Sequence, residues 1–164
     1  CFLGNNEIGS FLETHGPRQI EEGPILSTAG QLLGTHRGLF RYTIGQRKGL
    51  GIASSAPLYV TCLDVKRNAV IVGSNEELFR NRIDVAELHW LGTPPDTTRQ
   101  YTVRIRYSHP GSKATLALHE NANACGTIVF DEPQRAITPG QFAVIYDGTE
   151  LLGSGVIVSA VSES

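Results

Sequence analysis

The sequence predicts a mainly β protein: a small β-rich domain with a short helix, followed by a six-stranded antiparallel β-barrel. Turns are frequent, because the 164 residues include 18 glycines and 8 prolines. Hydrophobic residues make up 40% of the chain, which is enough for a buried core. In the second half they fall into six short runs rich in β-branched and aromatic side chains. Closing such strands into a barrel removes exposed sheet edges.

The smaller domain is expected over residues 1–75. A short helix is predicted at 5–15, where apolar side chains recur at helical spacing after an asparagine that can cap them. Two hairpins are predicted at 24–35 and 57–73, the second because β-branched runs flank a polar turn. Residues 38–50 fit either a helical turn or a glycine-rich loop, and the sequence leaves this choice open.

The larger domain is expected over residues 76–164, because the apolar pattern breaks around 75–81 and then resumes as strand after strand. Turn-forming pairs such as Pro139-Gly140 and Asp147-Gly148 separate some of these strands. The six predicted strands span 82–90, 100–108, 114–118, 126–130, 142–147 and 151–159.

The three cysteines are Cys1, Cys62 and Cys125, and they form neither a disulfide framework nor a zinc-ligand pattern. We therefore expect no metal site and a reducing, cytoplasmic location. Cys62 alternates with the other residues of a predicted strand, so it is expected to be a small core residue. No apolar run is long enough for a transmembrane helix, so no membrane partner is expected.

Cys1 stands at the start of a chain that contains no methionine. We expect the chain to be a processed protein or a piece of a longer one. A cysteine just before a helix can be a reactive thiolate, since the helix N-terminus favours its negative charge. Cys1 is therefore a candidate nucleophile or sulfur carrier, unless it only marks where the chain was cut.

Charge is nearly balanced, with 14 basic and 16 acidic residues, which argues against a strongly basic nucleic-acid binder. Residues 23–63 and 97–119, however, contain no Asp or Glu. These two basic zones favour a local anionic partner such as a phosphate backbone. Chance segregation of charge onto a solvated face explains them equally well.

The first segment with candidate binding residues is 43–51. Its three glycines allow a tight turn that presents Gln46, Arg47 and Lys48, and these side chains suit phosphate groups or base edges. The alternative is a glycine-rich connection with two solvated cations. The spacing of a Walker phosphate loop is absent.

The second segment is 104–107, within a predicted strand. Strand alternation places Arg104 and Arg106 on one face, with Ile105 and Tyr107 on the other. Two cations beside an aromatic residue suit RNA, where stacking and phosphate contacts dominate. A solvated barrel face is the alternative.

The third segment is 130–141, which is predicted to be a strand end, a rigid turn and the start of another strand. Pro133 and Pro139 fix the backbone and can hold Gln141 at a defined place. Physical reasoning alone favours a simpler interpretation, in which the segment is a barrel corner.

These motifs, in their order and spacing, resemble the tRNA-specific 2-thiouridylase family. The shared segments are Cys1-Phe2-Leu3-Gly4, residues 43–51, Arg106-Tyr107 and the stretch FDEPQRAITPGQ that ends at Gln141. The resemblance covers nearly the whole chain. It implies that the chain is the C-terminal part of such an enzyme, with a central domain and a β-barrel that follow an ATP-pyrophosphatase domain.

The resemblance also implies a reaction. Cys1 would be the second catalytic cysteine and would carry a persulfide received from a sulfur-relay protein or a cysteine desulfurase. ATP, with Mg²⁺, would be bound by the preceding domain and would adenylate the 2-oxygen of the wobble uridine of tRNA, so no cofactor is expected on this chain. Sulfur would then replace that oxygen, and a first cysteine in the preceding domain would form a disulfide with Cys1.

The family's tRNA contacts map onto Arg106, Tyr107 and Gln141. Many relatives carry another cation after the Arg-Tyr pair, where this chain has Ser108-His109. Further candidate RNA contacts are Gln46, Arg47, Lys48 and Arg104.

Two other functions stay open. The first is a non-catalytic RNA-binding barrel, which the two acid-free zones favour. The second is an N-terminal-nucleophile amidohydrolase that uses Cys1, although a helix directly after Cys1 and the lack of an evident base argue against it. In the leading interpretation this chain alone is expected to be inactive, because ATP binding would lie elsewhere in the enzyme.

Overall fold

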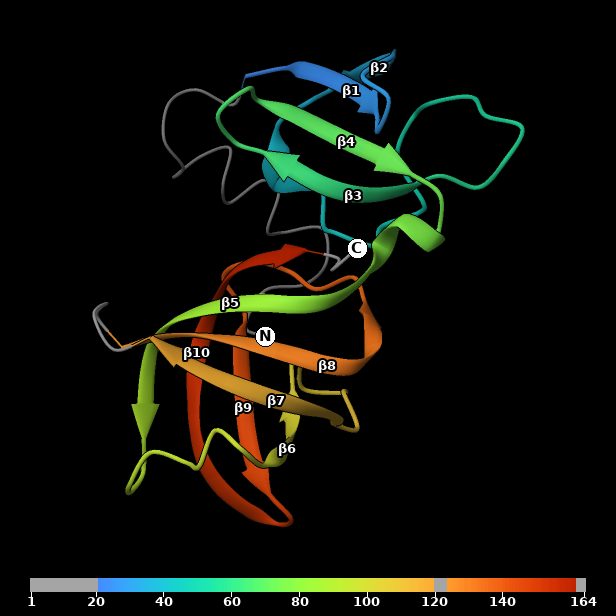
Figure 1. The fold of residues 1–164 in the computed structure, drawn as a ribbon. Helices are drawn as coiled ribbons and strands as arrows, with labels where there is room; N and C mark the ends of the chain where they lie inside the picture. The colour runs from blue at the N-terminus through green and yellow to red at the C-terminus, as the bar shows by residue number, and fades with distance from the viewer. Residues whose placement is uncertain (1–20, 120–123, 162–164) are drawn as a thin grey trace. The chain divides into compact units, whose positions relative to one another are not determined.

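The computed structural model describes residues 21–119 and 124–161, so Cys1 and the predicted helix at 5–15 lie outside the described residues. The chain divides after Leu78 into two compact units. One holds a four-stranded sheet and the other a closed six-stranded antiparallel barrel, which confirms the predicted mainly β fold class (Figure 1). No helix within the two described ranges is long and apolar enough to cross a membrane.

The first unit is built from two hairpins, and both are hairpins that the sequence predicts. Its strands are β1 (Gly23–Ser27), β2 (Leu32–His36), β3 (Tyr59–Asp64) and β4 (Ala69–Gly73). Within each hairpin the strands are antiparallel, whereas β1 and β4 pair in parallel and join the hairpins in the order β2-β1-β4-β3. Short 3₁₀ helices lie at Leu39–Arg41 and Glu76–Leu78, and most of 38–50 is loop. Fully buried Ile25, Val60 and Val70 contribute to the core of the unit.

A buried histidine connects the two hairpins of this unit. The Nε2–H of His36 donates to the backbone carbonyl of Asn68 at 2.9 Å, while its Nδ1 accepts from the Gly38 N–H at 3.0 Å. Asn68 has a positive φ of 48°, a conformation that asparagine tolerates better than most residues. Gly23 lies so close to the Asn68 carbonyl that a Cβ there would collide with it. His36 therefore has a structural role.

Cys62 is exposed, so the expectation that it is a core residue is wrong. The register between β3 and β4 shifts between Val60 and Cys62, which marks an irregularity of the β-bulge type. Such a shift moves the following side chains to the opposite face of the sheet. Val60 is buried before the shift and Leu63 packs on the core after it, so the phase of the alternation changes between them.

The second unit closes its strands in the order β10-β5-β8-β7-β6-β9 (Figure 1). Their bounds are β5 (Phe79–Trp90), β6 (Gln100–Arg104), β7 (Ser112–His119), β8 (Cys125–Arg135), β9 (Phe142–Asp147) and β10 (Glu150–Val161). Alternating residues fill the interior, among them Ile83, Val103 and Ile145, which are fully buried. Each such side chain contributes about 1.5–3 kcal/mol when it is fully buried.

The end of β6 differs from the prediction of a strand over 100–108. The strand ends at Arg104 because the chain then bends into a turn. The expected alternation over 104–107 is therefore wrong. Ile105 is buried in the barrel core while Tyr107 is fully exposed, so the two residues do not share a face.

The end of β8 also differs, because the strand does not stop near residue 130 but continues through Pro133 to Arg135. Proline is tolerated in a strand where the ladder is interrupted. The pairing of β8 with β5 is interrupted here, since the partners of Arg80 and Arg82 are Gln134 and Val129. The predicted rigid turn at Pro133 is thus an irregular part of a strand.

Candidate functional site

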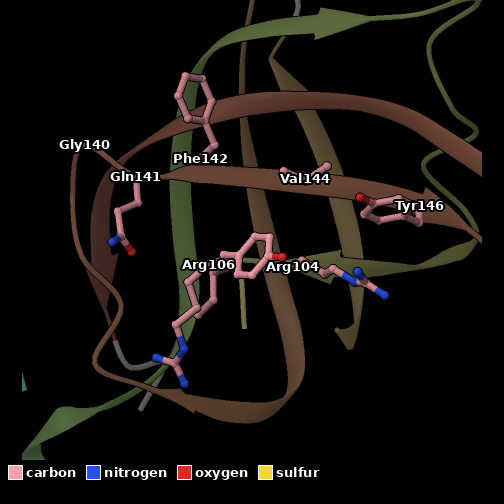
Figure 2. Close-up of a pocket in the computed structure, with 9 residues that line it drawn as sticks. Arg104, Arg106, Gly140, Gln141, Phe142, Val144 and Tyr146 are labelled. Atoms are coloured by element: carbon pink, nitrogen blue, oxygen red, sulfur yellow. The ribbon is translucent and has the colours of Figure 1, made fainter. Parts of the chain in front are cut away.

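A pocket of about 600 Å³ lies on the barrel unit, where the turn after β6 meets the start of β9 (Figure 2). All four barrel residues singled out from the sequence line it, namely Arg104, Arg106, Tyr107 and Gln141. None of the described residues that line this pocket is acidic. In Figure 2 the side chains of Gln141 and Arg106 lie toward one end of the pocket, and those of Arg104 and Tyr146 toward the other.

The turn after β6 presents Arg106 and Tyr107. Ile105 anchors the start of this turn in the barrel core, and the backbone N–H of His109 donates to the Arg106 carbonyl at 3.0 Å. The Arg106 guanidinium donates through Nη1 to the backbone carbonyl of Arg135 at 3.2 Å. Arg106 is therefore held against the end of β8, and its remaining N–H groups can still bind an anion.

A buried hydrogen-bond network fixes this turn. The Nε2–H of His109 donates to Oε1 of Gln134 at 2.9 Å, and the Ser112 hydroxyl donates to the same oxygen at 3.0 Å. The Gln134 amide in turn donates to the Glu132 carbonyl at 2.7 Å, and the Gly111 N–H approaches Nδ1 of His109 at 3.3 Å. His109 is thus a buried structural residue. No local pattern could have revealed the His109–Gln134 pair, because its members lie on different elements.

Gly111 closes the turn with a φ of 100°. A Cβ at this position would lie 2.5 Å from the Thr102 methyl group, which is closer than real contacts allow. Glycine is therefore required here on two grounds, backbone conformation and space.

Gln141 is positioned by a second turn. Gly140 has a φ of 86°, and its N–H donates to the Ile157 carbonyl at 2.8 Å. The Ile157 N–H donates back to the Gln141 carbonyl, also at 2.8 Å. The main chain of Gln141 is thereby tied to β10, and its exposed side chain lines the pocket.

Two aromatic residues of the pocket, Phe142 and Tyr146, were not among the site residues predicted from the sequence. On β9 the buried Ala143 and Ile145 alternate with these residues, so Phe142 and Tyr146 lie on the outward face. That alternation was visible in the sequence and could have revealed an aromatic outer face. The Arg104 guanidinium lies over the Tyr146 ring, 5.1 Å from its centroid, in a cation–π arrangement.

The 43–51 turn belongs to the first unit. The Gln46 amide accepts from the Thr43 N–H at 3.0 Å and donates to the Lys48 carbonyl at 2.9 Å, so it serves the turn itself. Arg47 and Lys48 are exposed, and Arg47 lines a small pocket of about 230 Å³.

This turn does not fit the phosphates of ATP. A phosphate-binding loop offers its backbone N–H groups to the ligand. The N–H groups of Thr43, Gly45 and Gln46 instead donate to oxygens of the protein. We place no step of ATP chemistry on these residues.

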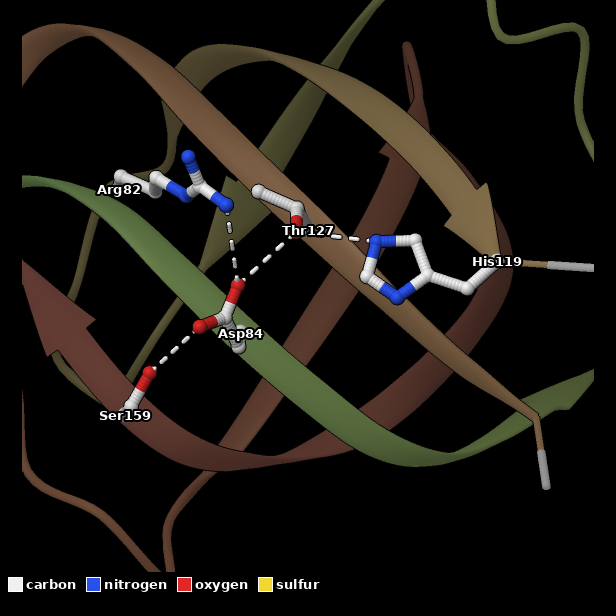
Figure 3. A network of polar contacts seen from close by, with 5 residues as sticks. All are labelled: Arg82, Asp84, His119, Thr127 and Ser159. Carbon is white, nitrogen blue, oxygen red and sulfur yellow. Dashed lines mark hydrogen bonds and ion pairs between the residues drawn. The ribbon is translucent and has the colours of Figure 1, made fainter. Parts of the chain in front are cut away.

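A second polar cluster crosses the barrel wall around Asp84 (Figure 3). Its carboxylate accepts from the Ser159 hydroxyl at 2.7 Å and from the Thr127 hydroxyl at 2.9 Å, and it lies 3.8 Å from the Arg82 guanidinium. Thr127 also contacts the Nε2 of His119 at 3.3 Å. The Ser159 hydrogen bond, and to a smaller extent Thr127, Arg82 and His119, hold the pKa of Asp84 below its usual range, against the opposing effect of burial.

The Asp84 cluster joins four neighbouring strands, β10, β5, β8 and β7, so we interpret it as a structural element of the barrel. Throughout the described part of the chain, no group of three or more His, Cys, Asp or Glu side chains is placed to hold a metal ion. The basic and aromatic pocket is therefore the candidate functional site.

Two protein-family models match the chain. A tRNA methyl transferase PRC-barrel domain matches residues 9–74, and an aminomethyltransferase beta-barrel domain matches residues 80–157.

Curated relatives match almost the full length of the chain. A tRNA-specific 2-thiouridylase MnmA from Desulfotalea psychrophila is 48% identical over 159 residues, which cover 96% of this chain and 46% of the relative. The protein of the same name from Symbiobacterium thermophilum is 46% identical over 164 residues, which cover 99% of this chain and 41% of the relative. The protein of this name from Moorella thermoacetica is 45% identical over 161 residues, which cover 97% of this chain and 44% of the relative. The chain therefore spans less than half the length of these relatives.

Proposed function

The chain belongs to the tRNA-specific 2-thiouridylase family, and from this premise we propose that its barrel pocket binds tRNA for an enzyme that thiolates a tRNA uridine. One observation carries the proposal. Residues of two motifs that lie far apart in the sequence line a single pocket that combines cations, aromatic rings and an amide.

The chemistry of the pocket suits RNA. Arginine binds phosphate through a planar fork of donors, and exposed aromatic rings stack on unpaired bases. Arg104 and Arg106 supply the first property, and Tyr107 supplies the second. The Gln141 amide offers both a donor and an acceptor for a base edge or a sugar hydroxyl. Arg47 and Lys48 are proposed as additional phosphate contacts in the first unit, whereas Gln46 would act by shaping the turn.

For the whole enzyme we propose thiolation at C2 of the anticodon wobble uridine, with Cys1 as the persulfide cysteine. The terminal sulfur of the Cys1 persulfide would bond to C2 while the 2-oxygen departs with AMP, and its bond to Cys1 would break in the next step. A second thiol outside this chain would attack the sulfur of Cys1, form a disulfide with it and so supply the two electrons that the transferred sulfur needs. ATP would activate the departing oxygen from a part of the enzyme outside this chain. The sulfur donor would be a sulfur-relay protein or a cysteine desulfurase.

The pocket proposal is tested by tRNA binding at several salt concentrations. Arg106→Gln removes the charge but keeps a donor for the Arg135 carbonyl, so the turn should persist. We expect weaker binding to all tRNAs and a slope of log affinity against log salt that is smaller by about one. Arg99→Gln is the matched control, because Arg99 is an exposed arginine of the same unit that pairs with Asp147 at 3.0 Å. Equal effects of both variants would show that only net charge matters and would reject the pocket.

The catalytic proposal is tested in the intact enzyme. In the host, Cys1→Ser should abolish 2-thiouridine in digested bulk tRNA, measured by mass spectrometry, while the protein stays expressed and folded. Unchanged 2-thiouridine would remove Cys1 from the sulfur path. If Arg106→Gln still weakened tRNA binding in that case, the chain would be better described as a non-catalytic RNA-binding barrel.

A further inference from the structure

We propose that the barrel pocket holds one unstacked nucleotide, with the Phe142 ring as the platform for its base and the two pocket arginines, which lie toward opposite ends of the pocket, beside its 5′ and 3′ phosphates. This inference rests on the proposed RNA-binding function and narrows it from RNA in general to an unpaired nucleotide. Phe142 was not among the residues that the sequence singled out.

The exposure of Phe142 is the first argument. On β9 the neighbouring Ala143 is fully buried. Phe142, in contrast, lines the pocket, and 59% of its surface is exposed. Tyr107, on the opposing segment, is also fully exposed. Two exposed aromatic residues in one hollow are unusual, because large apolar side chains normally lose exposure on folding. Aromatic faces offered to solvent beside cations are what binding proteins use to stack unpaired bases.

The fixed placement of the cations is the second argument. Arg104 lies over the Tyr146 ring at 5.1 Å, and Arg106 is held by the Arg135 carbonyl at 3.2 Å. Neither guanidinium has to be ordered when an anion arrives, so less entropy is lost on binding. Because no described lining residue is acidic, the pocket is complementary to a phosphate.

The shape of the pocket is the third argument. A hollow of about 600 Å³ has the size of a site for a small organic group. In an A-form duplex the bases are stacked inside, and only phosphates, sugars and base edges face the protein. A base can therefore reach the Phe142 ring only if it is unpaired or turned out of its stack.

The test compares two fluorescein-labelled probes on the whole chain, a single-stranded oligouridylate and a blunt RNA duplex of the same length. Phe142→Ala should weaken binding of the oligouridylate by about 5- to 150-fold, the range measured for one base–aromatic stack. It should leave binding of the duplex unchanged. Phe142→Tyr should restore the oligouridylate affinity, because it keeps the ring.

Val158→Ala is the matched control, since Val158 is an apolar residue of the barrel that is 52% exposed and does not line this pocket. Thermal unfolding of each variant checks the fold. This inference would be overturned if wild type and Phe142→Ala bound the oligouridylate with equal affinity. The proposed function would still stand if Arg106→Gln bound tRNA more weakly than wild type. Failure of the wild type to bind either tRNA or oligouridylate would overturn both. Displacement of the RNA by an equal concentration of polyglutamate would indicate an acidic protein partner and would also overturn the inference.

Discussion

Gln134 holds the pocket together although it does not line it. Its side-chain oxygen accepts from both His109 and Ser112, and its amide donates to the Glu132 carbonyl. Gln134 and His109 are both buried, and buried polar groups are costly when their partners are lost. The position of Arg106 and Tyr107 thus depends on an uncharged residue at the end of a neighbouring strand.

We therefore predict that Gln134→Leu lowers the free energy of unfolding by about 1–3 kcal/mol, because it leaves the His109 N–H and the Ser112 hydroxyl unsatisfied. It should also weaken tRNA binding under conditions in which the variant is fully folded. Urea denaturation measures the first effect. Gln100→Leu is the matched control: Gln100 is exposed and donates to Asp131, so a change within about 0.5 kcal/mol is expected. Equal losses in both variants would contradict the special role of Gln134.

At the scale of residues, the charged and exposed residues of the site could be predicted from the sequence. The buried residues that hold them in place by hydrogen bonds could not. Arg104, Arg106 and Gln141 lie in short, unusual motifs, and the structure places them in one pocket. Whether they bind tRNA stays a prediction. The Gln134–His109 pair could not be predicted, since a hydrogen bond between side chains of different elements depends on the tertiary fold.

The strands of the barrel wall are joined by the Asp84 cluster as well as by backbone hydrogen bonds. β10 and β5 shift register twice along their pairing, once between Ile157 and Ser159, next to the contact of Ser159 with Asp84. Such irregularities leave fewer backbone hydrogen bonds between two strands. The side-chain hydrogen bonds of Asp84 compensate for them at that point.

Asp84 should therefore make the barrel sensitive to acid. A carboxylate whose pKa is lower in the folded state stabilises the fold above its unfolded pKa of about 3.9, and this contribution is lost as pH falls through the lower folded pKa. We predict that Asp84→Asn is less stable than wild type at neutral pH and that the difference shrinks below about pH 4. Urea denaturation across this pH range measures it.

Ser159→Ala serves as the comparison for that experiment, because it removes the strongest hydrogen bond to Asp84 but keeps the carboxylate. At neutral pH its free energy of unfolding should lie between those of the wild type and Asp84→Asn. This free energy should also fall less with decreasing pH than that of the wild type. A difference between wild type and Asp84→Asn that stays constant with pH would show that the carboxylate charge has no part in stability.

At the scale of elements, the number of strands and their places along the chain could be predicted, but several strand ends could not. Periodicity located both hairpins of the first unit and all six strands of the barrel. β6 ends early because the chain bends after Arg104, and β8 runs past Pro133 because its pairing with β5 is interrupted. The interruption between β8 and β5 depends on the partner strand, so local patterns do not record it. Cys62 was misplaced for the same reason.

Each of the two compact units has an apolar core of its own. One core gathers around residues such as Ile25 and Val70, the other around residues such as Ile83 and Ile145. The chain divides after Leu78, and the domain limits of 1–75 and 76–164 stay a prediction. A closed barrel with its own core has what a small domain needs to fold alone.

We predict that residues 79–164, produced alone, unfold cooperatively and give dispersed amide signals in NMR spectra. Near-ultraviolet circular dichroism, followed through a urea titration, measures the transition. Ile145→Ala in the same segment should lower its stability by about 2–5 kcal/mol, because Ile145 is fully buried. A segment without near-ultraviolet signal, or one that Ile145→Ala leaves unchanged, would show that the barrel depends on the rest of the chain.

The parallel pairing of β1 with β4 has a consequence for the order of folding. Each hairpin of the first unit joins neighbours in the chain and can close within microseconds. Ile25 pairs with Val70, however, across a long intervening segment, and closing such a loop costs entropy before any contact compensates for it. Docking of the two preformed hairpins is therefore expected to limit the folding rate of this unit. Until they dock, the inner edges of β1 and β4 stay open to pairing with other chains, and the nascent protein is most exposed to aggregation during that interval.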